Sequence, residues 1–377
     1  MHCFRNLRSF AWFPKRMKTA LLLWTALIFS AVAQLPADKE EPIDWARAQT
    51  LHQRAQRGEK LTPDDQAYYE RAKAARARQQ PEPGPLPKPP EGLVPLTDMW
   101  ADARYQGEDG GLYGGGKNTP PAEHEKTARA ALAKVQPLNK TGNPSPDGRI
   151  VFVSISMSNA TQEFSVFKRI ADSDSRKSPA LTIVDCAQGG QAMAEWVPRD
   201  GGPWKTALKR ISAAGVTPEQ VQVAWVKLAN KSPRGPLAEH GRRLEKDTEA
   251  VLQNARAHFP NLRVVYLGSR IYGGYATSTL NPEPYAYESA FAARWLIQRQ
   301  MKGDAALAPD QSPVLLWGPY LWADGTHGRK TNPLVWERSD FVQDGTHPSE
   351  SGREKVARLL LDFVSTDPLA SGWFTGR

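Results

Sequence analysis

Five short apolar runs recur along the C-terminal part of the chain, and segments with helical periodicity separate them. Such runs, rich in β-branched and aromatic residues, are typical of strands buried on both faces of a parallel sheet. The runs are Ile150–Ile155, Ala180–Cys186, Val221–Val226, Leu262–Leu267 and Pro313–Trp317. The helical segments are Thr161–Ala171, Trp204–Ala214, Leu237–His258, Tyr287–Met301 and Ser349–Val364. Their alternation predicts an α/β fold, a three-layer α/β/α sandwich around a five-stranded parallel sheet with right-handed crossovers.

The first 95 residues follow a different pattern. Residues 34–80 are rich in Ala, Arg and Gln and predict a small helical N-terminal segment, with Thr62 as the N-cap of its second helix. Residues 81–95 are dominated by proline, which favours a stiff extended linker. We therefore place the main domain at 96–377. Its glycine-rich stretch 96–118 lacks the strand, the helix and the Lys-Ser/Thr of a phosphate-binding loop.

Residues 1–33 have the features of a signal peptide. Lys15, Arg16 and Lys18 precede the apolar run Ala20–Phe29, and Ala31–Ala33 supplies a small-x-small cleavage site. We expect a secreted or periplasmic protein with no membrane span after signal removal; an uncleaved anchor is the alternative. Initiation at Met17 would give a more compact signal.

Charge and cysteine content narrow the function classes. Loss of residues 1–33 removes five basic residues and no acidic one, so the net charge falls from +9 to +4. No basic cluster has the density that nucleic-acid binding needs, so we expect no nucleic-acid partner. Cys3 leaves with the signal, so Cys186 cannot form an intramolecular disulfide, and its apolar context predicts a buried structural thiol.

Polar residues follow the predicted strands at the edge where ligands bind in open parallel sheets. Ser158 follows the first strand and opens a helix, whose N-terminus favours a nearby oxyanion. Gly189 and Gly190 follow the second strand and allow a backbone N–H to approach a ligand. Asn230 follows the third strand and offers an amide donor, although a turn or capping role is open to each of these residues.

The sequence Asp-Gly-Thr-His occurs twice after the fifth predicted strand. Asp344 and His347 of the second copy precede an amphipathic helix, and their spacing lets the carboxylate orient the imidazole toward a serine. The first copy, Asp324 to His327, lacks such a helix. A metal site built from both copies is the rival interpretation, although no third ligand presents itself, and we expect no cofactor.

Ser154 and Ser156 are alternative nucleophiles. Both lie within or at the end of the first predicted strand, whereas Ser158 lies at the turn that follows it. The turn position favours Ser158.

The order Ser, Gly, Asn and Asp-x-x-His on this strand pattern resembles the SGNH (GDSL-like) hydrolase superfamily over residues 149–365. The resemblance implies a flavodoxin-like SGNH fold and a serine hydrolase acting on ester bonds, with Ser158 as nucleophile, His347 as general base and Asp344 orienting it. It also implies an oxyanion hole made of Ser158, Gly189 or Gly190, and Asn230. The chain departs from the usual Gly-Asp-Ser at Ser156-Met157-Ser158, and from Gly-x-Asn-Asp at Leu228-Ala229-Asn230-Lys231.

Aromatic residues are frequent in the predicted loops. Tyr113, Tyr272, Tyr320 and Trp322 suggest a substrate-binding cleft for sugar rings, although each also suits a core. We therefore expect a secreted esterase of a small-molecule or polysaccharide ester. A non-catalytic carbohydrate-binding protein on the same scaffold is the alternative, and an adhesion or scaffold protein that uses residues 34–95 is a third. Arg270 and Arg329 could instead select an anionic substrate.

Overall fold

The computed structural model describes residues 42–56, 60–79, 90–100 and 102–376. The chain divides into two units, Met1–Asp44 and Trp45–Arg377. The predicted signal peptide lies outside the described residues, as do residues 81–89 of the predicted linker.

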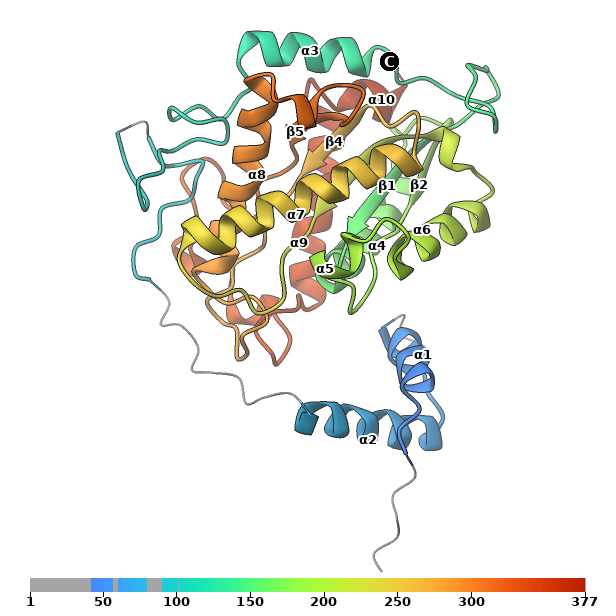
Figure 1. Cartoon of the computed structure of the whole chain (residues 1–377), viewed down its shortest axis with the longest axis vertical. Helices are drawn as coiled ribbons and strands as arrows, with labels where there is room; N and C mark the ends of the chain where they lie inside the picture. The colour runs from blue at the N-terminus through green and yellow to red at the C-terminus, as the bar shows by residue number, and fades with distance from the viewer. Residues whose placement is uncertain (1–41, 57–59, 80–89, 101, 377) are drawn as a thin grey trace, which may run out of the picture. The chain divides into compact units, whose positions relative to one another are not determined.

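A five-stranded, all-parallel sheet forms the centre of the main domain (Figure 1). The strand order is β2-β1-β3-β4-β5, which confirms the predicted α/β class. In this order β2 lies on one side of β1, whereas β3, β4 and β5 follow on the other side. Ligands of open parallel sheets bind outside the carboxyl ends of the strands at such a switch point. The strands are β1 (Ile150–Ser156), β2 (Leu181–Val184), β3 (Val221–Lys227), β4 (Val264–Leu267) and β5 (Val314–Trp317).

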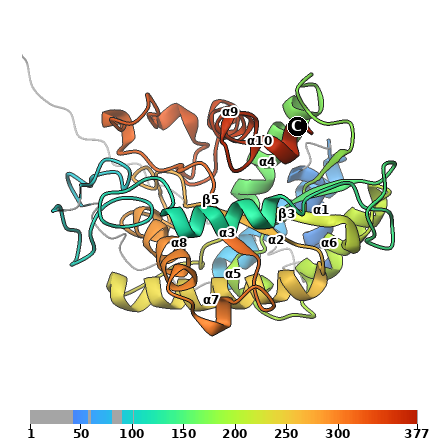
Figure 2. The ribbon, with the colours of Figure 1, turned by 90° about the horizontal axis from the view of Figure 1, so that it is seen from above.

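Helices cover one face of the sheet through a continuous apolar core. Val151, Val153 and Ile155 of β1 point into this core because alternate residues of a strand share a face. Figure 2 shows α7 and α8 on this side of the sheet. The helices that contribute to the core are α5 (Met193–Trp196), α6 (Gly202–Ala213), α7 (Leu237–His258) and α8 (Tyr285–Met301).

The intervening residues of β1, among them Ile150 and Phe152, face a second core on the opposite side. Here α4 and α9 contact each other along their length, and Figure 2 shows both on the side away from α7. The two faces complete the predicted three-layer sandwich. The helices of this second core are α3 (Ala122–Leu132), α4 (Ser158–Asp172), α9 (Glu350–Thr366) and α10 (Ser371–Thr375).

The N-terminal helical segment contains the two expected helices, α1 (Trp45–Gln56) and α2 (Pro63–Gln79). Asp65 in the first turn of α2 forms ion pairs with Arg47 and Arg54 of α1. Thr62 accepts the N–H of Asp65, as its predicted capping role requires.

Three α-helices were not predicted, the short α5 as well as α3 and α10. In α3 only His124 and Ala128 are buried, so its sequence carries no stripe of large apolar residues. Its signals are the acidic Glu123 and Glu125 in the first turn and the basic Arg129 in the last. None of the helices in the described ranges is long and apolar enough to cross a membrane.

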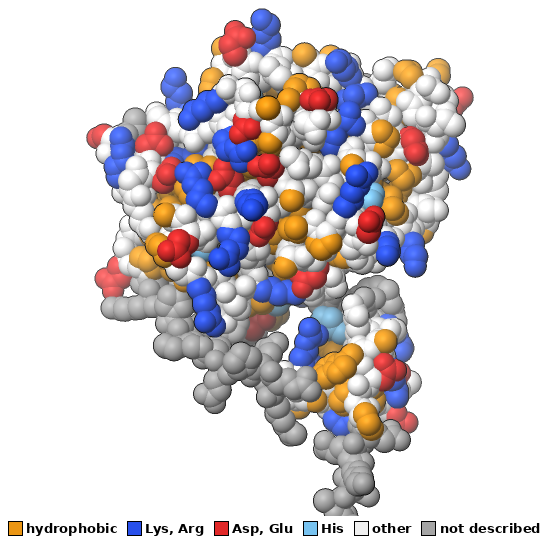
Figure 3. Space-filling model, viewed as in Figure 1, with side chains coloured by type: hydrophobic (Ala, Val, Ile, Leu, Met, Phe, Trp, Pro, Cys, Tyr) orange, Lys and Arg blue, Asp and Glu red, His pale blue; other side chains and the backbone are white. Residues whose placement is uncertain are grey.

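On the face seen in Figure 3, Lys and Arg side chains are interspersed with Asp and Glu side chains. Exposed ion pairs also form within single helices, between residues one turn apart. Arg129 pairs with Glu125 in α3, and Arg358 pairs with Glu354 in α9. Such pairs each contribute little to the free energy of unfolding.

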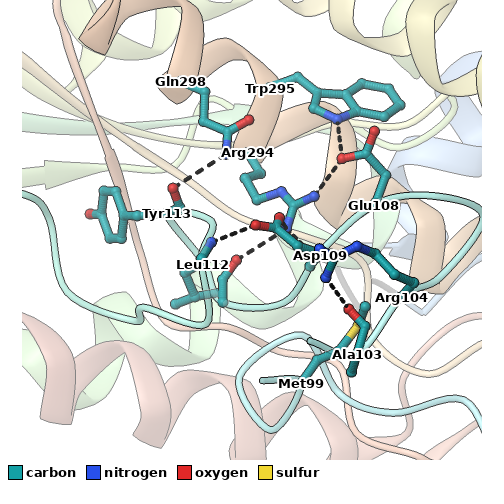
Figure 4. Close-up of polar contacts among 12 residues, drawn as sticks. Met99, Ala103, Arg104, Glu108, Asp109, Leu112, Tyr113, Arg294, Trp295 and Gln298 are labelled. Carbon is teal, nitrogen blue, oxygen red and sulfur yellow. Dashed lines mark hydrogen bonds and ion pairs between the residues drawn. The ribbon is translucent and has the colours of Figure 1, made fainter. Parts of the chain in front are cut away.

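The glycine-rich stretch is held against α8 by a buried arginine (Figure 4). The fully buried Arg294 donates to the backbone oxygen of Asp109 at 2.5 Å and pairs with the Glu108 carboxylate at 2.5 Å. Trp295 donates to the same carboxylate at 2.9 Å. Gly110 packs so tightly that a Cβ would lie 1.7 Å from the Met99 oxygen. These contacts give the glycine-rich stretch a structural role.

A buried ion pair connects the end of β3 to α4. Lys227 Nζ lies 2.5 Å from Glu163 Oε2, and both side chains are fully buried. Burial lowers the pKa of Lys227 to about 8, against the opposing effect of Glu163. Each charge therefore depends on the other for compensation.

We expect Glu163→Leu to lower the free energy of unfolding by about 3–5 kcal/mol, because it leaves the Lys227 amine buried without its partner. The double variant Glu163→Leu/Lys227→Met should recover most of that loss, since an apolar pair of similar volume needs no charge compensation. Urea denaturation of the three proteins measures both effects. Equal destabilisation of the single and double variants would contradict this account.

Candidate active site

Ser158 lies at the junction of β1 and α4. β1 ends at Ser156, Met157 has extended backbone geometry, and Ser158 is the first residue of α4. The N–H of a first helical residue has no partner within its helix, and the helix dipole there favours negative charge. Ser158 is partly exposed at the carboxyl end of β1, where the sheet order places a ligand site.

A chain of hydrogen bonds joins Ser158 to the turn before α9. Ser158 Oγ lies 2.7 Å from His347 Nε2, and His347 Nδ1 lies 2.6 Å from Asp344 Oδ2. A proton on Nδ1 donates to the carboxylate, which leaves Nε2 free to accept the serine proton. This is the arrangement that activates a serine nucleophile.

The Asp344 carboxylate is held ionised. Burial alone would raise its pKa, but the side chain and N–H of His347 and the N–H of Thr346 all donate to it and lower the pKa to about 2. The two backbone N–H groups each donate to Oδ1 at 2.9 Å. One carboxylate thus orients the imidazole and also fixes the turn that carries it.

Glycine is required in that turn. Gly345 has a φ of +63°, and a Cβ there would lie 1.7 Å from the backbone oxygen of Tyr275. The turn is also tied to α4, because the buried Asn159 amide donates to the Thr346 oxygen at 2.7 Å. The Thr277 N–H donates to the backbone oxygen of Asp344 at 3.0 Å. The histidine is therefore positioned by three segments of the chain.

A cavity opens beside the serine and the histidine. Met157, Ala192 and Ala229 form a small apolar cluster within it. Its lining includes Ser158, Asn159, Gly190, Asn230, Lys231, Arg270, Leu280, Asn281 and His347. The predicted Ser158, Gly190, Asn230 and His347 thus share one cavity.

The structure distinguishes the two candidate glycines. Gly190 lines the cavity and has a φ of +75°, whereas Gly189 is not among the residues that line it. Lys231 Nζ donates to the Gly190 oxygen at 2.8 Å and pairs with Glu195 at 2.5 Å. Lys231 therefore holds the Gly190 loop in place.

A carboxylate of α7 orients the side-chain amide of Asn230. Its Nδ2 donates to Asp247 Oδ2 of α7 at 3.2 Å. An amide nitrogen carries two protons, so the second stays available to a ligand in the cavity. Asp247 had no sequence signal, because only the packing of α7 brings it to the end of β3.

The alternative serines are committed to structural hydrogen bonds. Ser154 is fully buried, donates to Asp185 at 2.6 Å and accepts the N–H of Cys186 at 3.0 Å. Ser156 is also fully buried, and its hydroxyl donates to the Lys227 oxygen. Neither hydroxyl reaches the cavity.

The other chemical candidates lie apart from this cavity. His327 is 85% exposed and 3.5 Å from Asp324, in a separate turn. Within the part of the chain that the structure describes, no three His, Cys, Asp or Glu side chains are grouped to hold a metal ion. Cys186 is buried in the core, and burial raises its pKa.

The aromatic residues predicted to bind substrate are placed differently. Tyr113, Tyr320 and Trp322 are at most 7% exposed and belong to the core, so they cannot contact a substrate directly. Tyr320 accepts the Leu96 N–H, and Trp322 donates to Glu283. Tyr272 is partly buried against Trp322 and is not among the residues that line the cavity. The predicted contact with substrate was therefore wrong for Tyr113, Tyr320 and Trp322, because these loop residues pack into the core.

Comparison with known proteins identifies structural neighbours of low sequence identity. No protein-family model and no curated protein matches the chain. A Bacteroides fragilis protein described as an acylhydrolase has a TM-score of 0.35 and 14% identity, over 65% of this chain and 97% of its own. A gut microbial diltiazem-metabolizing enzyme has a TM-score of 0.34 and 13% identity, over 59% of this chain and 47% of its own. A GDSL-like lipase from Bacteroides thetaiotaomicron has a TM-score of 0.30 and 13% identity, over 64% of this chain and 96% of its own.

All three alignments have TM-scores below 0.5.

We expect Asn230→Ala to lower kcat by about 100-fold or more with little change in KM, because the amide donor would act on the oxyanion and hardly on the ground state. Asp247→Ala, which only frees the amide to rotate, should have a smaller effect in the same direction. Steady-state kinetics on a chromogenic acetate ester measures both. An unchanged kcat in Asn230→Ala would remove this residue from the oxyanion hole.

Proposed function

We propose that the chain is a serine ester hydrolase in which Ser158, His347 and Asp344 form the catalytic triad. The observation that carries this proposal is the continuous hydrogen-bond chain from Ser158 Oγ through the imidazole to an ionised carboxylate. It lies at the mouth of a cavity that contains backbone and amide donors.

The reaction proceeds through an acyl-enzyme. His347 Nε2 takes the Ser158 proton as the oxygen attacks the ester carbonyl, and the imidazolium is stabilised by Asp344. The tetrahedral oxyanion accepts hydrogen bonds from the N–H groups of Ser158 and Gly190 and from the Asn230 amide. His347 then gives its proton to the departing alcohol. Water attacks the acyl-enzyme by the same route in reverse and releases the acid.

The cavity supports a small acyl group. Met157, Ala192 and Ala229 form its apolar cluster, and they lie beside the proposed oxyanion donors Gly190 and Asn230. An acetyl group suits so small a cluster, whereas a long acyl chain needs more apolar surface.

The alcohol part of the proposed substrate is polar. Lys231 and Asn281 line the same cavity and offer ammonium and amide groups to hydroxyls. We therefore keep an acylated carbohydrate as the proposed substrate, supported by these polar side chains instead of by aromatic stacking.

The first test is intact-mass labelling with a small fluorophosphonate, followed by peptide mapping. We expect a single adduct on Ser158, because its Oγ alone among the three neighbouring serines contacts an imidazole. His347→Ala should abolish labelling, since the hydroxyl then loses its base.

Ser165→Ala serves as the matched control, because this exposed hydroxyl of α4 donates only within its own helix. It should label at the rate of the unmodified protein. A folded protein without an adduct would favour the alternative, a non-catalytic carbohydrate-binding protein. An adduct on Ser156 would show that the wrong serine was chosen.

We also propose export, supported by the basic, apolar and small-residue order of residues 15–33. Protein recovered from its native host should begin at Gln34, because cleavage follows Ala33 in this pattern. Mass measurement of the mature N-terminus tests this, and an intact N-terminus in the membrane fraction would support the uncleaved anchor instead.

A further inference from the structure

Arg270 is a buried arginine whose side chain makes no hydrogen bond or ion pair with the residues that the structure describes. It follows β4 by three residues, is 3% exposed and lines the same cavity as Ser158 and His347. Its Nε and Nη1 atoms are fully enclosed and make no hydrogen bond. Buried guanidinium groups are almost always paired, so the missing partner of Arg270 indicates a ligand.

Two other arginines of the chain are paired, the fully buried Arg294 and the partly buried Arg329. Arg294 pairs with Glu108 and Asp109 and donates to backbone oxygens, so that only its Nε makes no hydrogen bond. Arg329 donates to Asn332 at 2.7 Å and to the Tyr320 oxygen. Of the two arginines that the sequence suggested for anion binding, only Arg270 is left without such bonds.

The acidic side chains near Arg270 do not form ion pairs with it. Glu163, Glu283 and Asp344 act on it only at a distance, and none of them forms an ion pair with it. Glu163 is paired with Lys227, and Asp344 holds His347. Glu283 accepts hydrogen bonds from Gly273, Tyr287 and Trp322.

The guanidinium stays positive at neutral pH. Burial lowers the pKa of Arg270 to about 10, which the three acids partly oppose, and the group is therefore protonated at pH 7. A positive charge enclosed beside the cavity attracts an anion strongly, because little water screens it.

Asn281 provides a second unpartnered group in the same cavity. The residue is 5% exposed, and its Oδ1 has no hydrogen-bond donor, while its Nδ2 donates to the Asn230 oxygen at 3.4 Å. An enclosed donor set and an enclosed acceptor thus share one cavity. A carboxylate and a hydroxyl on one ligand would satisfy both.

We propose that Arg270 binds a carboxylate on the alcohol part of the substrate, and that Asn281 accepts a hydrogen bond from a neighbouring hydroxyl. This inference rests on the proposed ester hydrolysis and gives its substrate class, an acylated sugar acid or related hydroxy acid. The small apolar cluster at Met157 holds the acyl group. The carboxylate that pairs with Arg270 therefore belongs to the alcohol part of the substrate.

The test compares two esters acetylated at the same position that differ only at C6, which is a carboxylate in O-acetylated galacturonic acid and a neutral hydroxymethyl group in O-acetylated galactose. The protein should hydrolyse the acid with a kcat/KM at least about tenfold higher, because an enclosed charge-assisted pair forms only with the carboxylate. Arg270→Gln should lower kcat/KM for the acid to the value for the neutral ester, which removes the preference, and Arg270→Lys should retain part of it. Arg358→Gln, which changes an exposed arginine of α9, is the matched control and should keep the full preference.

Binding to Ser158→Ala protein, measured by calorimetry, separates this inference from the proposed hydrolysis. The acid should bind more tightly than the neutral ester, and Ser158→Ala/Arg270→Gln should bind both equally. Preferential binding without turnover in the unmodified protein would uphold the carboxylate site and refute the esterase. Equal binding and equal kcat/KM for the two esters would overturn the carboxylate site, and Arg270 would then be a structural residue bridged by water.

Discussion

The contact between Ser158 and His347 depends on the packing of α4 against α9. The two residues are 189 positions apart in the chain, and each lies at or just before the N-terminus of one of these helices. Because the helices contact each other along their length, the two N-terminal turns meet at the carboxyl edge of the sheet. The Asn159 bond to the turn at Thr346 then fixes the distance between them. The packing of two helices thus brings the nucleophile and its base together.

Buried charge surrounds this junction. Lys227 and Glu163 are fully buried and compensate each other under the serine turn, whereas Arg270 is buried without a partner beside the cavity. Uncompensated burial of a charge costs several kcal/mol in most settings. A protein tolerates that cost where a ligand provides the missing charge, which is the physical basis of the carboxylate site proposed above.

The two residues at which the sequence differs from the motifs that it resembles, Met157 and Lys231, have defined contacts in the structure. Met157 is part of the apolar cluster beside the serine, where an acid would bring a charge to a small acyl group. Lys231 bonds to the Gly190 oxygen and to Glu195, and so connects the loops after β2 and β3. Both changes leave the hydrogen-bond chain through His347 intact.

The sequence by itself determined the layer architecture and the members of the candidate triad. Strand periodicity is local, and the strand-end rule for parallel sheets places Ser158, Asn230 and His347 at one edge without any knowledge of packing. Only the tertiary structure decided which side chains face the cavity. Tyr113 and Trp322 lie in loops by sequence yet are buried, while Arg270 is buried yet has no partner. Side-chain direction and pairing depend on contacts between segments far apart in the chain, such as Asp247 of α7 behind Asn230. Such contacts leave no periodic signal in a single sequence.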